Sequence, residues 1–292
     1  MQKVAWSTKT KGDALQYDFE FPPLSSVDAL DGWASILWIG DAHMDHPSCS
    51  RETLTRHLDL ALARNIPVLI GGDFLCAMQG PNDRRRTYKG IRPEDQEEDY
   101  YSAITESAAK YLQPYREIIT YIGKGNHETS VTRHAGVDMT KLLVGYLTEG
   151  GKGPKLGGYQ DWFIVRGSIN GHRHGRKTMY RHHGSGGGGP VTRGVIQTNR
   201  RAVHYQADVL LYEHIHHAWT MPIRQQRVTE GGHVVNVEQL HVCNPGLKDE
   251  YTGKRGGFAI EREHHPKPTG STLLQFRCCT PHGLEAQAQL IR

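Results

Sequence analysis

The sequence predicts an α/β fold with parallel strand pairing in its first half. Three short apolar runs that end in or next to glycine are typical of buried strands: 34–40, 66–72 and 117–123. Segments with helical periodicity follow them: 50–65, 93–115 and 137–149. Ser50 is the expected N-cap of the first helix, and acidic residues open the second, as the helix dipole favours. This alternation of strands and helices predicts parallel pairing.

The second half predicts more β structure. Residues 161–167 and 176–184 are expected to pair as strands, with the intervening "SINGHRHG" as their connecting loop. The pattern then predicts a helix at 191–206 and strands at 207–212, 233–243, 257–263 and 271–279. Residues 1–33 are expected to form an irregular N-terminal extension, and 34–292 a single domain. The glycine-rich run 184–189 is expected to be a loop within that domain.

Composition limits the possible partners and cellular compartment of the protein only broadly. The formal net charge of +4, with both signs well mixed, indicates neither nucleic acid nor membrane as a partner. The five cysteines are odd in number and lack a CxxC pair, and the sequence shows no signal-peptide pattern and no apolar run of membrane-spanning length. We therefore expect a cytoplasmic protein of a reducing compartment, without a membrane partner. The sequence leaves its oligomeric state open.

Polar residues follow all three buried strands of the first half. Asp41 and His43 follow the first strand, Asp73 the second, and Asn126 and His127 the third. The carboxyl ends of parallel strands meet at one edge of a sheet, so these side chains are expected to share a site. A single aspartate after a strand is usually a cap or turn former. Three such strand ends are harder to explain in that way.

Five motifs in this order resemble the calcineurin-like metallophosphoesterases. That family has D-x-H, G-D, G-N-H-D/E, H-G and G-H-x-H, and this chain has "DAH", "GGD", "GNHE", "HHG" and "EHIHH". The resemblance spans residues 36–246 and includes "NPG" at 244–246. It implies a four-layer αββα sandwich, in which two mixed β-sheets are flanked by helices. It also implies two adjacent divalent transition-metal ions at one edge, with Mn²⁺ expected first and Fe, Ni²⁺ or Zn²⁺ as alternatives.

The resemblance also assigns the ligands. It implies that Asp73 bridges the two ions, and it divides the remaining ligands into a first set and a second set: Asp41, His43 and His216, then Asn126, His183 and His214. His127 would face the substrate and assist the leaving group as the catalytic histidine. In "RHHG" the residue next to glycine matches the family motif, so His183 is preferred to His182 as the ligand. Glu128 is expected either to orient His127 or to bind nothing.

Several features leave alternatives open. Glu213 stands where the family usually has glycine, and either crowds the turn or supports a ligand histidine. His172 and His174 in "NGHRHG" have metal-like spacing but precede the H-G motif, so we expect them in a hairpin loop and not at the metals. Some basic residues either reach substrate phosphate or lie in solvated loops: Arg84, Arg85, Arg86, Lys89, Arg133 and His134.

The implied function is hydrolysis of a phosphate ester by a metal-activated hydroxide. We expect phosphodiesters of nucleotide or nucleic-acid type, on the basis of the family analogy and the local basic clusters. The alternatives are a phosphomonoesterase, a nuclease acting on DNA or RNA, and a non-catalytic metal-binding scaffold of the same fold. A nuclease would need a positive groove. A scaffold usually has eroded ligands, whereas all seven ligands and His127 are present here.

Overall fold

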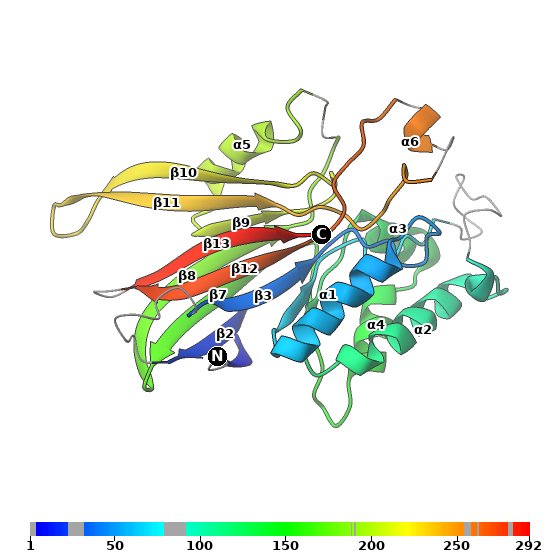
Figure 1. The fold of residues 1–292 in the computed structure, drawn as a ribbon, viewed down its shortest axis with the longest axis horizontal. Coiled ribbons are helices and arrows are strands. Elements are labelled where there is room, and N and C mark those ends of the chain that lie inside the picture. The colour runs from blue at the N-terminus through cyan, green and yellow to red at the C-terminus, as the bar shows by residue number, and fades with distance from the viewer. Residues whose placement is uncertain are drawn as a thin grey trace.

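Two mixed β-sheets pack face to face and carry helices on their outer faces (Figure 1). The computed structural model describes residues 4–22, 32–78, 92–187, 189, 191–253, 258–261, 263–279 and 283–292. Within these residues the expected fold class, two mixed sheets flanked by helices, is confirmed.

The larger sheet has seven strands in the order β1-β2-β7-β8-β9-β11-β10. Their bounds are Ala5–Lys11, Ala14–Phe21, Gln160–Ile169, His172–His182, Val209–Tyr212, Val234–Cys243 and Trp219–Val228. The smaller sheet has six strands in the order β13-β12-β3-β4-β5-β6. Their bounds are Gly283–Ile291, Ser271–Cys279, Ala34–Ile39, Val68–Ile70, Ile119–Ile122 and Lys155–Leu156. Strands β3, β4, β5 and β6 are parallel, as are β8, β9 and β11, so their carboxyl ends lie on common edges.

Four helices cover the smaller sheet: α1 (Arg51–Arg64), α2 (Tyr100–Leu112), α3 (Asn126–Ala135) and α4 (Met139–Leu147). Helix α5 (Ile196–His204) lies beside the larger sheet, and α6 (Phe258–Glu261) is a single short turn (Figure 1). Two 3₁₀ turns, Pro93–Asp95 and Gln113–Tyr115, precede and follow α2.

Strand β3 contributes to both cores because its side chains alternate. Leu37 and Ile39 pack against the helices, whereas Ile36 and Trp38 face the other sheet. The core between the sheets is rich in aromatic residues, including Tyr17, Phe19 and Phe163. A third, small cluster of Tyr180, Leu210 and Tyr212 lies on the outer face of the larger sheet.

The expectation of an irregular N-terminal extension was wrong for Ala5–Phe21. These residues form β1 and β2, and β2 pairs in parallel with β7 inside the larger sheet. Tyr17, Phe19 and Phe21 alternate with polar residues and are buried between the sheets. The burial of this apolar face holds the segment in place.

Several other elements differ from the sequence prediction. Helix α2 begins at Tyr100, because the acidic stretch before it forms a 3₁₀ turn and bends. "SINGHRHG" lies mostly within β7 and β8, whose turn is at Asn170 and Gly171, so His172 and His174 are strand residues. In 257–263 the described residues include helix α6 instead of a strand. Ser50 occupies the N-cap position of α1 but makes no side-chain capping hydrogen bond. Strands β10 and β13 and helix α3 had not been predicted.

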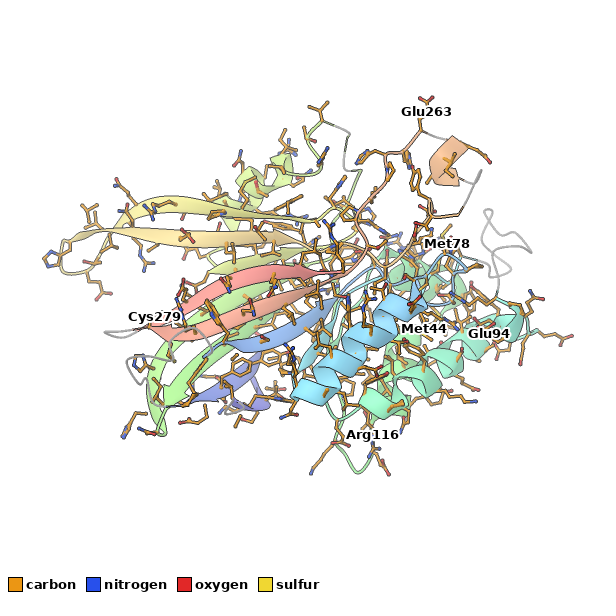
Figure 2. All side chains as sticks on the ribbon, viewed as in Figure 1. Met44, Met78, Glu94, Arg116, Glu263 and Cys279 are labelled. Carbon is orange, nitrogen blue, oxygen red and sulfur yellow. The ribbon has the colours of Figure 1, made fainter. Side chains whose placement is uncertain are left out.

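The loops after β3 and β4 lie at the helical end of the molecule. Figure 2 shows Met44 and Met78 there, whereas Cys279, the last residue of β12, lies at the opposite end. Among the described residues, no helix has both the length and the apolar character needed to cross a bilayer.

Phe19→Ala tests whether the N-terminal strands belong to the core. Phe19 is 2% exposed, and its ring centroid lies 6.3 Å from that of Phe276. We expect the free energy of unfolding to fall by about 3–5 kcal/mol because the substitution leaves a cavity. Chemical denaturation measures the change, and Thr10→Ala on exposed β1 is the control. Equal, small effects of the two substitutions would contradict the packing described.

Candidate metal centre

The expected ligands come from five strand ends that meet at one edge. Asp41 and His43 follow β3, Asp73 follows β4, and Asn126 begins α3 just after β5. From the larger sheet, His183 follows β8, while His214 and His216 follow β9. The edge therefore joins both sheets, and each sheet supplies part of the ligand set.

Asp41, His43 and His216 form the first group. One ligand atom from each lies within 4.8 Å of the others. The His216 Nε2 is 3.5 Å from Asp41 Oδ1, and the rings of His43 and His216 stack at 5.3 Å. Asp41 Oδ1 and both ring nitrogens of His43 are buried without a hydrogen-bond partner. Buried polar atoms rarely remain unpaired, so this group fits a cation.

Asp73, His183 and His214 form the second group, again within 4.8 Å. His183 Nε2 lies 3.2 Å from Asp73 Oδ2 and 3.1 Å from the Asn126 amide oxygen. The backbone amide of His214 donates to Asp41 Oδ2 at 2.9 Å and so links the two groups. The first group has the residues of the first implied set. The second group contains Asp73, the implied bridge, with His183 and His214 of the second set, and the Asn126 amide oxygen lies beside His183.

Five of these residues have left-handed backbone conformations. The φ angles are 47° for Asp41, 47° for His43, 52° for Asp73, 77° for His214 and 54° for His216. Residues other than glycine rarely adopt such angles, and they persist where the surrounding structure holds them. A cluster of them at one edge is typical of a functional site.

Backbone hydrogen bonds fasten the first two loops together. The amides of Asp41, His43 and Met44 donate to the carbonyls of Gly72, Asp73 and Phe74, at 3.0, 3.0 and 2.8 Å. The loops thus extend the parallel pairing of β3 and β4 beyond the strands. This extension fixes the spacing between Asp41 and Asp73.

Two buried carboxylates, those of Glu128 and Asp45, bind backbone amides of the loop after β4. Glu128 accepts from the amides of Asp73, Leu75 and Gly125, at 3.0, 3.1 and 2.8 Å. Asp45 accepts from the amides of Cys76 and Ala77. Glu128 therefore neither orients His127 directly nor stays without partners, and its role is to hold the backbone of the loop that carries Asp73.

Glu213 lies fully buried between the two sheets. Its carboxylate accepts from Arg181 Nη2 at 2.6 Å, Trp38 Nε1 at 2.6 Å and the Gly72 amide at 2.9 Å. Its Oε2 also lies 3.2 Å from His183 Nδ1. Burial by itself would raise the pKa of Glu213, but Arg181 and His183 lower it to about 2. Glu213 thus supports His183, a ligand candidate, in agreement with the second of its two expected roles.

Glycines make room for this glutamate. A Cβ atom on Gly71 would lie 1.7 Å from Glu213 Oε1, and one on Gly40 would lie 3.0 Å from it. Glu213 therefore does not crowd its own turn, because the space it needs comes from the loops after β3 and β4. The glycine missing at position 213 is compensated by glycines on the other sheet.

The pKa values of the site residues reflect burial and the charges of their neighbours. Burial raises the pKa of Asp41 well above its usual value, and Asp73 and Glu213 raise it further against the effect of His183. Burial also acts to raise the pKa of Asp73, but His183 and the other histidines lower it. Burial and the neighbouring His127 lower the pKa of His43. A bound cation would favour the ionised carboxylates and neutral imidazoles that metal binding requires.

His127 faces the same edge from the start of α3. Its Nδ1 donates to the Cys76 carbonyl at 2.5 Å, and its Nε2 lies 3.7 Å from Asp73 Oδ2. Its backbone amide donates to Asp73 Oδ1 at 2.9 Å. The ring lies 4.8 Å from that of His43, edge to face. The backbone of the loop after β4 thus orients His127 beside the first group.

The other candidate residues lie elsewhere. His174 is nine residues before His183 along β8, which corresponds to about 30 Å at about 3.3 Å per residue. His182 accepts from the Gly184 amide at 2.9 Å and packs against Tyr159, and it belongs to neither group of ligand candidates. Arg133 and His134 lie in the exposed last turn of α3. The segment with Arg84, Arg85, Arg86 and Lys89 lies outside the described residues.

Sequence reasoning missed several contributors. Arg181, the partner of Glu213, stands just before the H-G motif, but only the packing of the sheets brings them together. Lys248 and Lys267 lie near the first group, since burial and then these two charges lower the pKa of His216. Lys248 stands two residues after the "NPG" of 244–246, and this position was its signal in the sequence. Lys267 had none.

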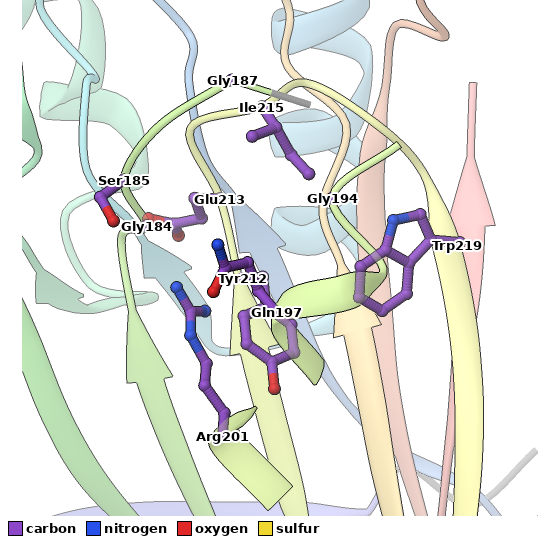
Figure 3. A pocket seen from close by; sticks show the side chains of 10 residues that line it. All are labelled: Gly184, Ser185, Gly187, Gly194, Gln197, Arg201, Tyr212, Glu213, Ile215 and Trp219. Atoms are coloured by element: carbon purple, nitrogen blue, oxygen red, sulfur yellow. The ribbon is translucent and has the colours of Figure 1, made fainter. Parts of the chain in front are cut away.

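A small pocket borders the ligand-bearing loops (Figure 3). Gly184, Glu213 and Ile215 line it beside the ligands, and Arg201 and Gln197 reach it from α5. The Arg201 guanidinium also lies over the Tyr212 ring, 4.3 Å from its centroid. Arg201 therefore places a positive charge next to the loops that carry His183 and His214.

Comparison with known proteins identifies no family for this chain. No family model and no curated protein sequence matches it. Among solved structures, it is similar to Vps29 of Chaetomium thermophilum, at 11% identity and a TM-score of 0.37 over 88% of this chain and 95% of that one. It is also similar to the Thermotoga maritima protein TM1076, at 13% identity and a TM-score of 0.30 over 88% and 98%. Likenesses this weak assign neither a family nor an activity.

Glu213→Gln tests the buried ion pair. The substitution leaves the Arg181 guanidinium buried without its counter-charge, so we expect the free energy of unfolding to fall by about 3–5 kcal/mol. Glu238→Gln on an exposed position of β11 is the matched control, with an expected effect below about 0.5 kcal/mol. Urea titration measures both. Similar values for the two variants would show that the pair does not hold the sheets.

His183→Ala and His174→Ala distinguish the two histidine motifs. We expect the first substitution to lower the metal content, because it removes a ligand candidate of the second group, and the second to leave it unchanged. Metal analysis after dialysis measures the content, near two ions per chain for the unsubstituted protein. Loss of metal only in His174→Ala would contradict the assignment.

Proposed function

We propose that this chain is a phosphoesterase of the calcineurin-like metallophosphoesterase type, with a centre for two divalent cations. The observation that carries the proposal is the convergence of seven metal-competent side chains, from both sheets, at one edge. The ordered sequence motifs and the unpaired buried atoms of Asp41 and His43 support it independently. Membership in the family rests on these motifs.

The proposed ligand sets follow the two groups. Asp41, His43 and His216 would hold one cation, Asn126, His183 and His214 would hold the other, and Asp73 would be shared by both. When bound, two such cations lower the pKa of a water and neutralise charge on a phosphate. Carboxylate, imidazole and amide donors suit Mn²⁺, and also Fe, Ni²⁺ or Zn²⁺.

His127 is the proposed catalytic histidine. The Cys76 carbonyl fixes its ring, so that Nε2 is the nitrogen turned towards the centre. At this place the protonated Nε2 can donate to the oxygen of the leaving group, or stabilise charge that develops on it. Lys248 and Lys267 add positive charge near His216 and suit the binding of phosphate oxygens.

Phosphodiesters are the proposed substrates, of nucleotide or nucleic-acid type. The family analogy and the positively charged side chains beside the centre, including that of Arg201, support this choice. A phosphomonoesterase would share every ligand and differ in the shape of its pocket. A non-catalytic scaffold would share the fold and the metals but turn over neither type of ester.

The decisive experiment compares chromogenic phosphodiester and phosphomonoester substrates. Metal-stripped protein is assayed with and without added Mn²⁺, with Asp73→Asn as the inactive reference. We expect Mn²⁺-dependent turnover, faster on the diester. Turnover faster on the monoester would favour the phosphomonoesterase, and absence of both would favour the scaffold. Steep loss of nucleic-acid cleavage with salt would indicate a nuclease.

His127→Ala is expected to lower kcat by about 10²–10⁴-fold while the metal content stays unchanged. The loss should be larger for an ester with a poor leaving group, because such a group needs its proton more. Kinetics over a series of substituted phenyl esters measures this dependence. His134→Ala, in the exposed last turn of the same helix, is the control. An equal loss across the series would contradict the role of proton donor.

A further inference from the structure

Cys76 lies at the metal edge, although no expected ligand set contains it. It is the third residue after Asp73, and its side chain is 2% exposed. Its Sγ and one ring nitrogen each of His43 and His127 lie within 4.8 Å of one another. The thiol therefore shares His43 with the first group of ligands.

The backbone around Cys76 is fixed. Asp45 accepts from the amides of Cys76 and Ala77, and the Tyr100 hydroxyl donates to the same carboxylate at 3.0 Å. The Cys76 carbonyl accepts from His127. Ala77 has a left-handed φ of 51°. These restraints fix the backbone that carries the Cys76 side chain.

His43 provides an independent indication of a ligand. Its side chain is 3% exposed, and neither ring nitrogen has a hydrogen-bond partner. A buried imidazole with both nitrogens unpaired is costly unless a cation takes one of them. His43 belongs both to the group with Asp41 and His216 and to the group with Cys76 and His127.

We propose that Cys76 is a thiolate ligand of the cation held by Asp41 and His43. This inference rests on the proposed function, because it assumes a cation in the first group. On binding, the Cys76 S–H bond breaks, its proton leaves to solvent, and a sulfur–metal bond forms without any change in oxidation state. A thiolate is a soft ligand, so the first position prefers Zn²⁺ or Fe²⁺ to the Mn²⁺ expected from oxygen and nitrogen donors alone.

Cobalt substitution tests the proposal directly. Metal-stripped protein is loaded with Co²⁺, and the absorption spectrum is recorded for the unsubstituted chain, Cys76→Ala and Cys278→Ala. Cys278 is the matched control, since it is also buried but lies at the far end of β12, next to the Cys279 marked in Figure 2. We expect an intense near-ultraviolet thiolate-to-cobalt band in the unsubstituted chain and in Cys278→Ala, and its loss in Cys76→Ala. X-ray absorption of the zinc form should show a Zn–S distance of about 2.3 Å.

The outcomes separate this inference from the proposed function. Cobalt bound without a thiolate band, or a band that persists in Cys76→Ala, would overturn the assignment of Cys76 and leave the metal centre intact. Failure of the unsubstituted chain to bind cobalt, zinc or manganese would overturn both. Circular dichroism of each variant confirms that it is folded. Cys76→Ser provides a second variant that fills the same space with a harder donor, and the band should be lost there too.

Discussion

The buried pair of Arg181 and Glu213 is the interaction on which the rest of the site depends. Arg181 comes from β8, and Glu213 follows β9, so both belong to the larger sheet. Their partners Trp38 and the Gly72 amide belong to the smaller sheet. Leaving either charge unpaired at this depth would cost about 3–5 kcal/mol. The hydrogen bonds of Glu213 with Trp38 and Gly72 hold the two sheets in one relative position at this edge. The same carboxylate orients His183, which ties the packing of the sheets to the geometry of the metal centre.

The loops that carry the ligands are shaped by this constraint and by two further carboxylates. Glu128 and Asp45 bind amides in the loop after β4, and backbone bonds fasten that loop to the one after β3. Left-handed conformations at Asp41, His43 and Asp73 are thereby maintained without glycine. A site preorganised in this way would bind the proposed cations with little rearrangement.

Much of the fold could be predicted because buried parallel strands have a plain signature. The apolar runs at β3, β4, β5 and β9 were identified, and with them the edge where the site lies. β2 was missed although Leu15, Tyr17, Phe19 and Phe21 alternate with polar residues, because the proline-rich stretch after them suggested an irregular segment. The start of α2 was placed too early, since acidic residues favour both a first helical turn and the turn that precedes it.

By itself, the sequence determined which residue types stand after which strands, because motif order and strand periodicity are local properties of the chain. It thereby predicted the ligand candidates and His127 before any contact was known. Only the tertiary structure decided what Glu213 does, since its partners lie 32 residues away at Arg181 and 175 residues away at Trp38. It likewise separated His183 from His174 and brought Cys76 to His43. Contacts between sheets depend on how whole strands pack, and no local pattern records them.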